Sequence, residues 1–268
     1  MEEAKKREIE TLAEEIGADY VFEHAVDPFA IAEDYGIDVI FEDYKTAFKG
    51  LVWYYHENFN IHLNSSIIET ATCCDARSTC AHELGHYFLP EHFKRLISGN
   101  SISFRGSSFG IIETALEAEA DYFGVSLLMP QNMFVSTVSY FPEGFESVFG
   151  SKELFKTSLT STAIRYTTLN KFPYLLIRSE KGNKIKKWVS PSFSEQIAIE
   201  PIISINPKRK PVGIELKNHH GTGIRYWGGY SLLKYWVLNA HPQFMNRMVY
   251  EENLRTPSFN LILIKLLS

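Results

Sequence analysis

The sequence is poor in cysteine, and the few cysteines are badly spaced for cross-links. Only three occur in 268 residues: Cys73 and Cys74 are adjacent, and Cys80 follows shortly after. Such a set makes a poor disulfide framework, and no C-x-x-C pair is present to hold a metal through thiolates. The composition therefore favours the reducing cytosol, and we expect a cytoplasmic protein in which Cys80 packs in a core.

The sequence also lacks a secretion signal and an uninterrupted apolar run. The first 17 residues alternate in charge and carry an apolar stripe that includes Ile9 and Ile16, the pattern of an amphipathic helix. The longest uncharged stretch, residues 122–142, contains Pro130 and two polar residues after it, which would leave polar groups unsatisfied in lipid. We therefore expect no membrane partner.

Charge is not balanced along the chain. Residues 171–268 hold 15 Lys and Arg against 6 Glu, a net charge of +9, whereas residues 1–170 hold 12 against 26, a net charge of -14. The basic part contains KGNKIKKW and NPKRK with Trp188, Tyr226, Trp227 and Trp236 interleaved. Cationic surface with stacking rings is typical of single-stranded nucleic-acid binding, so single-stranded DNA or another anionic activator is one hypothesis. A solvated lysine-rich hairpin over an aromatic core is the simpler interpretation.

Hydrophobic periodicity and turn residues predict helices and a small sheet first, then mostly strands, with a boundary near residue 171. Asp27 and Pro28 form a predicted N-cap and first turn, and Gly36 can end that helix. The other predicted elements are a strand at 37–41, a hairpin from 50–56 and 60–63, helices at 76–89 and 111–128, further helix within 131–170, and strands from 173 onward.

One motif in the acidic part contains residues that can bind a metal ion and transfer a proton. His82, Glu83 and His86 form H-E-x-x-H in AHELGHYFL. Residues four apart lie on one face of a helix, so the two imidazoles can converge on one metal ion. Glu83 can then accept a proton from water and pass it to a leaving amine, which makes it the candidate general base.

A catalytic zinc usually has three protein ligands, so a third is needed. ETALEAEADYF supplies Glu117 and Asp121, four apart on one helical face, with Glu113 a turn earlier and Glu119 pointing elsewhere. We assign Glu117 to the metal and Asp121 behind it, because a ligating imidazole usually donates its other N–H to a carboxylate. Glu113 is the reserve ligand. The competing interpretation is a solvated acidic face, but apolar residues flank this row.

AHELGHYFL followed by EAEADYFGVSLLMP resembles the ImmA/IrrE family of metallopeptidases. PFAIAEDYGIDV and IHLNSS are similar to the family's entry helix and to the strand before its active-site helix, and the resemblance covers residues 28–130 well. The stretch ARSTC before the motif departs from many relatives. LTSTAIRYTTL is similar to a helix-turn-helix remnant, and the C-terminal part is compatible with a GAF-like sensor domain.

The resemblance implies an α+β chain with three parts. These are a mostly helical, zincin-like peptidase domain with a small sheet at 1–130, a helical linker at 131–170, and an α/β GAF-like domain at 171–268. It makes His82, His86 and Glu117 ligands of Zn²⁺, with Mn²⁺ as the alternative metal, and Glu83 the general base.

The function implied by the resemblance is site-specific cleavage of a DNA-binding repressor that carries a helix-turn-helix domain. Such cleavage would switch on a stress, mobile-element or defence programme. The alternative is a non-cleaving, zinc-containing regulator that binds a repressor or DNA. The basic composition of a DNA-binding face is missing from 160–170, which has a single Arg.

Three further hypotheses concern the surroundings of the site. His92, Tyr87 and Tyr166 are candidate donors to an oxyanion, although each is more often a core or surface residue. The strand at 50–55 can hold an extended substrate if it lies at a sheet edge. A thiolate of Cys73 or Cys74 could occupy the open metal position and keep the site inactive.

Overall fold

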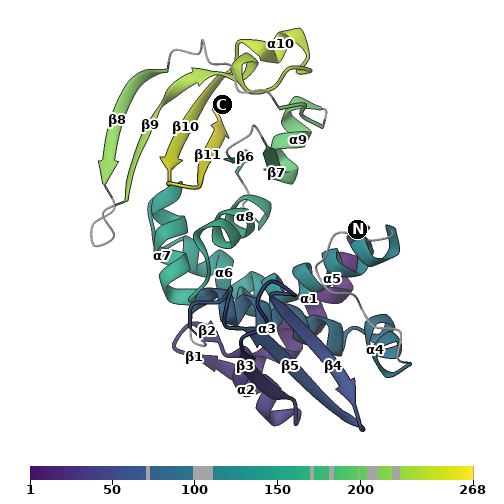
Figure 1. Cartoon of the computed structure of the whole chain (residues 1–268). Coiled ribbons are helices and arrows are strands. Elements are labelled where there is room, and N and C mark those ends of the chain that lie inside the picture. The colour runs from purple at the N-terminus through teal and green to yellow at the C-terminus, as the bar shows by residue number, and fades with distance from the viewer. Residues whose placement is uncertain are drawn as a thin grey trace. The chain divides into compact units, whose positions relative to one another are not determined.

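The computed structural model describes residues 1–70, 73–98, 111–169, 172–180, 184–198, 200–203, 211–218 and 224–267. Within these ranges helices and sheets are mixed, which confirms the predicted α+β class (Figure 1). The chain divides into two compact units. The first comprises Met1–Phe134 and Lys152–Ser158, and the second Val135–Ser151 and Leu159–Ser268. The domain limits after residues 130 and 170 stay a prediction.

The first unit opens with the predicted amphipathic helix. Helix α1 (Glu3–Gly17) buries Ile9 and Ala13 and leaves its charged residues toward solvent. Tyr122 on helix α5 (Ile111–Leu128) donates its hydroxyl hydrogen to Glu10 Oε2 at 2.7 Å, which links the two helices. A 3-10 turn, η1 (Ala18–Tyr20), and two short paired strands, β1 (Val21–Phe22) and β2 (Ala25–Val26), follow α1.

Helix α2 (Pro28–Asp34) begins and ends at the residues that the sequence predicts. Asp27 Oδ1 accepts the Phe29 backbone N–H at 3.0 Å, and Pro28 occupies the first turn. Gly36 has φ +68°, a left-handed conformation that glycine adopts without steric cost. The chain therefore leaves the helix sharply and enters the sheet.

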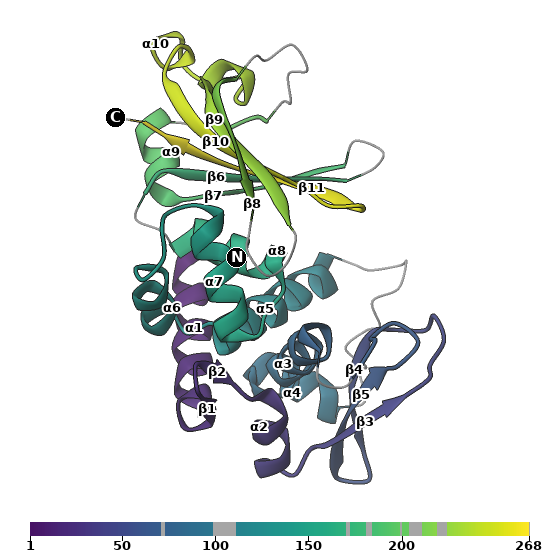
Figure 2. The same ribbon diagram turned by 90° about the vertical axis from the view of Figure 1, so that its left-hand side faces the viewer.

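The small sheet has three strands: β3 (Asp38–Glu42), β4 (Gly50–Tyr55) and β5 (Asn58–Asn64). Their order is β3-β5-β4, with β5 parallel to β3 and antiparallel to β4. The predicted hairpin is thus confirmed, and β4 lies at an edge of the sheet. Ile61 and Leu63 point to the buried side, toward helix α3 (Cys74–Phe88), which contacts both β4 and β5 (Figure 2).

Helices α3 and α5 form the centre of the first unit and approach each other closely. A Cβ added at Gly124 would lie 3.1 Å from the backbone nitrogen of His82, and one at Gly85 would lie 3.2 Å from the backbone of Ala120. Glycine at both contacts lets the two backbones come together where larger side chains would hold them apart. The buried apolar cluster around this contact includes Ile31, Val52, Ile61, Leu63, Ala81, Leu84, Phe123 and Leu127.

Helix α4 (Pro90–Ile97) begins directly after α3, because Pro90 cannot continue the preceding helix but suits a first turn. It buries His92 and Leu96. The segment predicted as further helix contains α6 (Gln131–Val138), α7 (Phe145–Phe155) and α8 (Leu159–Leu169).

The second unit contains a six-stranded antiparallel sheet with the order β7-β6-β11-β10-β9-β8. Its strands are β6 (Tyr174–Glu180), β7 (Ile185–Val189), β8 (Val212–Asn218), β9 (Arg225–Leu232), β10 (Met248–Arg255) and β11 (Phe259–Leu266). Helix α9 (Pro191–Ile197) contacts β6, and the turn η2 (Leu233–Tyr235) and helix α10 (Pro242–Met245) lie between β9 and β10. β6 and β7 pair as antiparallel strands, so the predicted strands from residue 173 onward and the lysine-rich hairpin are confirmed.

Aromatic side chains divide between core and surface in the second unit. Trp236 is fully buried and donates its ring N–H to Glu251 Oε2 at 2.8 Å, and Tyr226 is buried with its hydroxyl on Glu146. Neither ring can stack on a base, so the aromatic part of the nucleic-acid hypothesis is reduced to Trp188 and Trp227. NPKRK lies outside the described residues.

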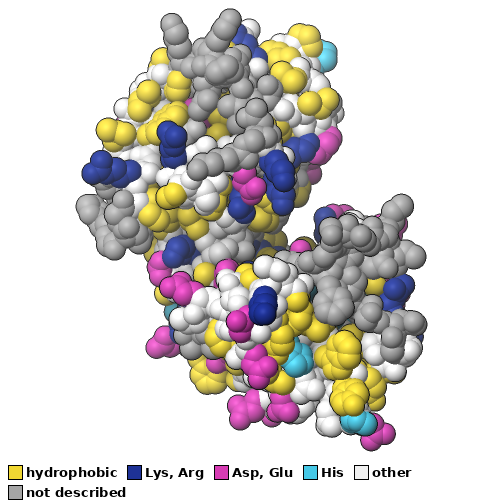
Figure 3. Space-filling model, in the orientation of Figure 1, with side chains coloured by type: hydrophobic (Ala, Val, Ile, Leu, Met, Phe, Trp, Pro, Cys, Tyr) yellow, Lys and Arg dark blue, Asp and Glu magenta, His cyan; other side chains and the backbone are white. Residues whose placement is uncertain are grey.

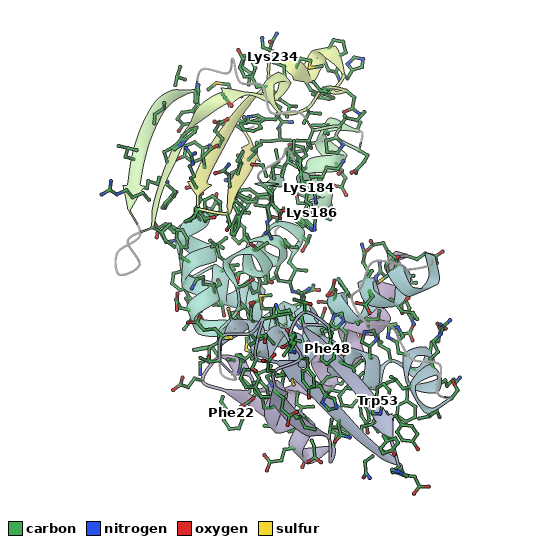
Figure 4. The ribbon with its side chains drawn as sticks, in the orientation of Figure 1. Phe22, Phe48, Trp53, Lys184, Lys186 and Lys234 are labelled. Carbon is green, nitrogen blue, oxygen red and sulfur yellow. The ribbon has the colours of Figure 1, made fainter. Side chains whose placement is uncertain are left out.

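Charged side chains follow the division that the sequence shows. On the face in Figure 3, Asp and Glu are frequent on the first unit, and Lys and Arg are frequent on the second. Lys186 on β7 and Lys184 directly before this strand are both exposed, and both are labelled in Figure 4. Basic surface is therefore present in the second unit.

Gly124→Val should destabilise the protein although valine has the higher helix propensity. The added side chain would collide with the α3 backbone, so we expect the free energy of unfolding to fall by roughly 1–3 kcal/mol in urea titrations. The matched control is Ala118→Val on the exposed face of the same helix. Equal stability of the two variants would contradict the close approach of α3 and α5.

Candidate metal centre

The site is built on the buried middle of α3. Cys73 Sγ accepts the Ala76 backbone N–H at 3.4 Å and caps the start of this helix. Two turns later, His82, Glu83 and His86 have exposed fractions of 7%, 5% and 3%. Polar groups buried this deeply need partners, and α5 and β4 supply them.

Three side chains converge on one point. The Nε2 atoms of His82 and His86 lie 3.2 Å apart. Glu117 on α5 places Oε2 3.5 Å from His82 Nε2 and Oε1 3.4 Å from His86 Nε2. The close contact between α3 and α5 brings this carboxylate to the two rings.

The donor set and its spacing fit a zinc ion. Two ligand atoms at 2.0–2.1 Å from a tetrahedral zinc lie about 3.3 Å apart, close to all three distances between these side chains. Two imidazoles and one carboxylate are also a ligand set that leaves a fourth position open. His82, His86 and Glu117 are thus a candidate metal site.

Asp121 lies behind His82, one helical turn beyond Glu117. Its Oδ1 is 2.9 Å from His82 Nδ1, the ring nitrogen that does not face Glu117. Burial opposes the charged form of His82, but the hydrogen bonds to Asp121 and Glu117 outweigh burial and raise its pKa to about 9. Burial likewise opposes ionisation of Glu117, yet the hydrogen bonds from His82 and His86 hold its pKa well below the usual range. The pocket therefore favours positive charge beside its carboxylates.

Glu83 points toward the edge strand of the small sheet. Its Oε2 accepts the Val52 backbone N–H at 2.9 Å. A Cβ at Gly50 would lie 2.8 Å from Glu83 Oε1 and 2.2 Å from Thr79 Cγ2, so only glycine fits between strand and helix. The outer edge of β4, at Gly50 and Val52, thus lies against the candidate general base.

The sequence predicts His92 as a candidate oxyanion donor, but it lies in the interior of the first unit. It is fully buried on α4, with Nδ1 3.0 Å from His86 Nδ1 and Nε2 3.4 Å from Glu119 Oε2. Burial and the neighbouring His86 lower its pKa to about 3, so the ring is neutral. It has no access to a substrate, and the oxyanion hypothesis for His92 is wrong.

The other two candidate donors are engaged elsewhere. Tyr87 packs among aromatic rings, with its centroid 4.9 Å from that of Phe59. Tyr166 is buried in the second unit, where its hydroxyl accepts the Gly144 backbone N–H at 3.0 Å. Tyr87 is therefore not part of the cluster of His82, His86 and Glu117, and Tyr166 belongs to the other unit.

The cysteines also lie away from the cluster. Cys73 and Cys74 stand at the start of α3, and eight residues of helix put about 12 Å between Cys74 and His82 along the axis. The described geometry therefore places neither thiol at the open metal position. Cys80 is fully buried in the core, as predicted, and burial raises the pKa of its thiol. The reserve ligand Glu113 has a side chain outside the described part of the structure.

Comparison with known proteins shows the family of the chain. Residues 32–166 match the peptidase M78 family, described as the IrrE N-terminal-like domain, and the chain belongs to this family. The resemblance to ImmA/IrrE proteins is thus confirmed. A comparison with curated proteins finds no match.

The fold is also similar to that of a solved structure, a transcriptional regulator from Mycobacterium tuberculosis. The identity is 11% and the TM-score 0.54, over 97% of this chain and 76% of that chain. At this identity the likeness shows a shared fold. None of the helices in the described ranges has both the length and the apolar character needed to cross a membrane.

Glu117→Gln should weaken zinc binding by roughly 100-fold or more, because it removes the anionic ligand while keeping the shape of the side chain. Competition with a chromophoric chelator measures the change. Glu15→Gln, an exposed carboxylate on α1, is the control and should bind zinc as the wild type does. If Glu117→Gln binds zinc as tightly as the wild type, Glu117 is not a zinc ligand.

Proposed function

We propose that the chain is a zinc-dependent, site-specific endopeptidase that cleaves a DNA-binding repressor. The observation that carries this proposal is the convergence of His82, His86 and Glu117 beside the buried carboxylate of Glu83. Membership of the M78 family supports peptide hydrolysis as the chemistry. A cytoplasmic location, where such a repressor acts, belongs to the same proposal.

Each residue of the site has one role in this reaction. His82, His86 and Glu117 hold the metal, which is Zn²⁺ or alternatively Mn²⁺, and Asp121 fixes the orientation of His82 through Nδ1. When bound, the metal supplies Lewis-acid activation of water and of the scissile carbonyl. Glu83 accepts the proton of the attacking water and delivers it to the leaving amine. The Val52 N–H, bonded to Oε2, holds the Glu83 carboxylate in place for this transfer.

A peptide is the substrate class that suits the strand beside the site. β4 lies at an edge of its sheet, and its Val52 N–H reaches Glu83 Oε2. Extended peptides bind to such edges by adding a strand through main-chain hydrogen bonds. A peptide added along β4 would pass Glu83 and would pair with main-chain groups of β4 other than the Val52 N–H, which Glu83 already holds.

The repressor substrate is proposed from the family resemblance and from the fold shared with a transcriptional regulator. Its cleavage would release a stress, mobile-element or defence programme. The rival function is a non-cleaving zinc protein that binds a repressor or DNA. Arg165, the only basic residue of the helix-turn-helix-like α8, is 1% exposed, which disfavours contact of that helix with DNA phosphates.

An anionic activator at the second unit is a separate part of the proposal. The net charge of +9 in 171–268 and the exposed Lys184 and Lys186 support it. Single-stranded DNA is the probe that this chemistry favours. A GAF-like sensor role for the same unit stays a prediction.

Glu83→Gln should abolish cleavage and retain zinc, because the amide cannot accept the proton while the three ligands stay in place. The measurement is co-expression with a candidate repressor that carries a helix-turn-helix domain, followed by detection of a shortened repressor. Glu91→Gln, an exposed carboxylate on α4, is the control and should cleave normally.

The outcomes of this experiment separate the hypotheses. Cleavage by Glu83→Gln at the wild-type rate would refute the role of Glu83. An intact repressor with zinc-loaded wild type would refute cleavage of that repressor and favour the non-cleaving regulator.

Lys184→Glu combined with Lys186→Glu should weaken binding of an oligothymidylate. Each lost phosphate contact should lower the slope of log affinity against log salt by about 0.7 for a single strand, so about 1.4 is expected for both. A double variant with the same charge change on the first unit, Lys45→Glu with Lys94→Glu, is the control. If the wild type does not bind the oligothymidylate at low ionic strength, the hypothesis of an anionic activator is refuted.

A further inference from the structure

The two imidazoles of the metal centre have different supports on their outer nitrogens. His82 Nδ1 meets a carboxylate oxygen, Asp121 Oδ1, at 2.9 Å. His86 Nδ1 instead meets another imidazole, His92 Nδ1, at 3.0 Å. The sequence pattern predicts the first contact and contains no sign of the second.

The contacts of His86 determine where its proton lies when a metal is bound. Its Nε2 is the nitrogen that faces His82 and Glu117, at 3.2 Å and 3.4 Å. A neutral imidazole that coordinates through Nε2 carries its hydrogen on Nδ1. His86 therefore donates from Nδ1, and His92 Nδ1 must accept.

The same reasoning fixes the proton of His92. A neutral ring that accepts at Nδ1 carries its hydrogen on Nε2. His92 Nε2 lies 3.4 Å from Glu119 Oε2, and this carboxylate is an acceptor. One assignment satisfies every nitrogen: His86 donates to His92, and His92 donates to Glu119.

We propose that His92, with Glu119 behind it, is a positioning residue for the metal centre that holds His86 in the orientation and tautomer needed for metal binding. The proposal rests on the zinc site of the proposed function. Helix α4 then has a role in metal binding, because among the described residues only its His92 offers an acceptor to His86 Nδ1. Helices α3, α4 and α5 are then joined through one chain of hydrogen bonds that ends at the metal ligand.

Packing alone is the competing explanation of a buried histidine. The rings of His86 and His92 have centroids 5.0 Å apart and are tilted by 36°, so they are also in contact. The two explanations differ in what may replace His92. Phenylalanine keeps the ring and loses the acceptor, whereas asparagine loses the ring and can keep an acceptor near Nδ1.

The test measures binding of Zn²⁺ alone and the visible absorption of the Co²⁺-substituted full chain, with His92→Phe, His92→Asn and the exposed control His24→Asn. We expect His92→Phe to lose about 10- to 100-fold in zinc affinity, as for other partners of metal ligands, and to shift the Co²⁺ bands. His92→Asn should recover most of the affinity, and His24→Asn should match the wild type.

Wild-type zinc affinity and unchanged Co²⁺ bands in His92→Phe would overturn the proposal. If His92→Phe fails to fold, as judged by circular dichroism of the metal-free chain, His92→Asn decides. Affinity near wild type in that variant supports the positioning role, and a loss of 10-fold or more in a folded chain overturns it. A wild type that binds zinc but leaves the repressor intact would contradict only the peptidase proposal, whereas a wild type that binds no zinc would overturn both.

Discussion

The candidate metal centre depends on the close approach of two helices. α3 carries His82 and His86, but two imidazoles on one helix leave a zinc ion without its third protein ligand. Gly124 lies against the backbone of His82, and Gly85 against that of Ala120, so the two helices pack at backbone distance. Glu117 then reaches both imidazoles. A fold that separated these helices by one larger side chain would lose the carboxylate from the cluster.

Much of the fold and of the site follows from local sequence patterns. The Asp27 cap, the turn at Gly36, the β4–β5 hairpin and the α3 and α5 helices are set by spacing and by residues with strong conformational preferences. Helical spacing also predicts that His82 and His86 share a face. The structure brings Glu117 and Asp121 to them, while the chemical roles of these residues stay a prediction.

Other features depend on contacts between distant segments, which a local pattern does not contain. The parallel pairing of β3 with β5 joins strands about twenty residues apart, and the Val52 N–H on Glu83 joins residues 31 apart in the chain. The contact between His92 and His86 belongs to this class, because it depends on where α4 packs. For Trp236 the sequence leaves two interpretations, a stacking ring and part of an aromatic core, and its burial beside Glu251 favours the core.

Metal analysis of the native protein combined with X-ray absorption at the metal edge shows whether His82, His86 and Glu117 bind a zinc ion. We predict one zinc per chain with only nitrogen and oxygen ligands, imidazole among them, at about 2.0–2.1 Å. Absence of metal both in native protein and after reconstitution would contradict it. So would a ligand shell at about 2.3 Å, the distance of a thiolate.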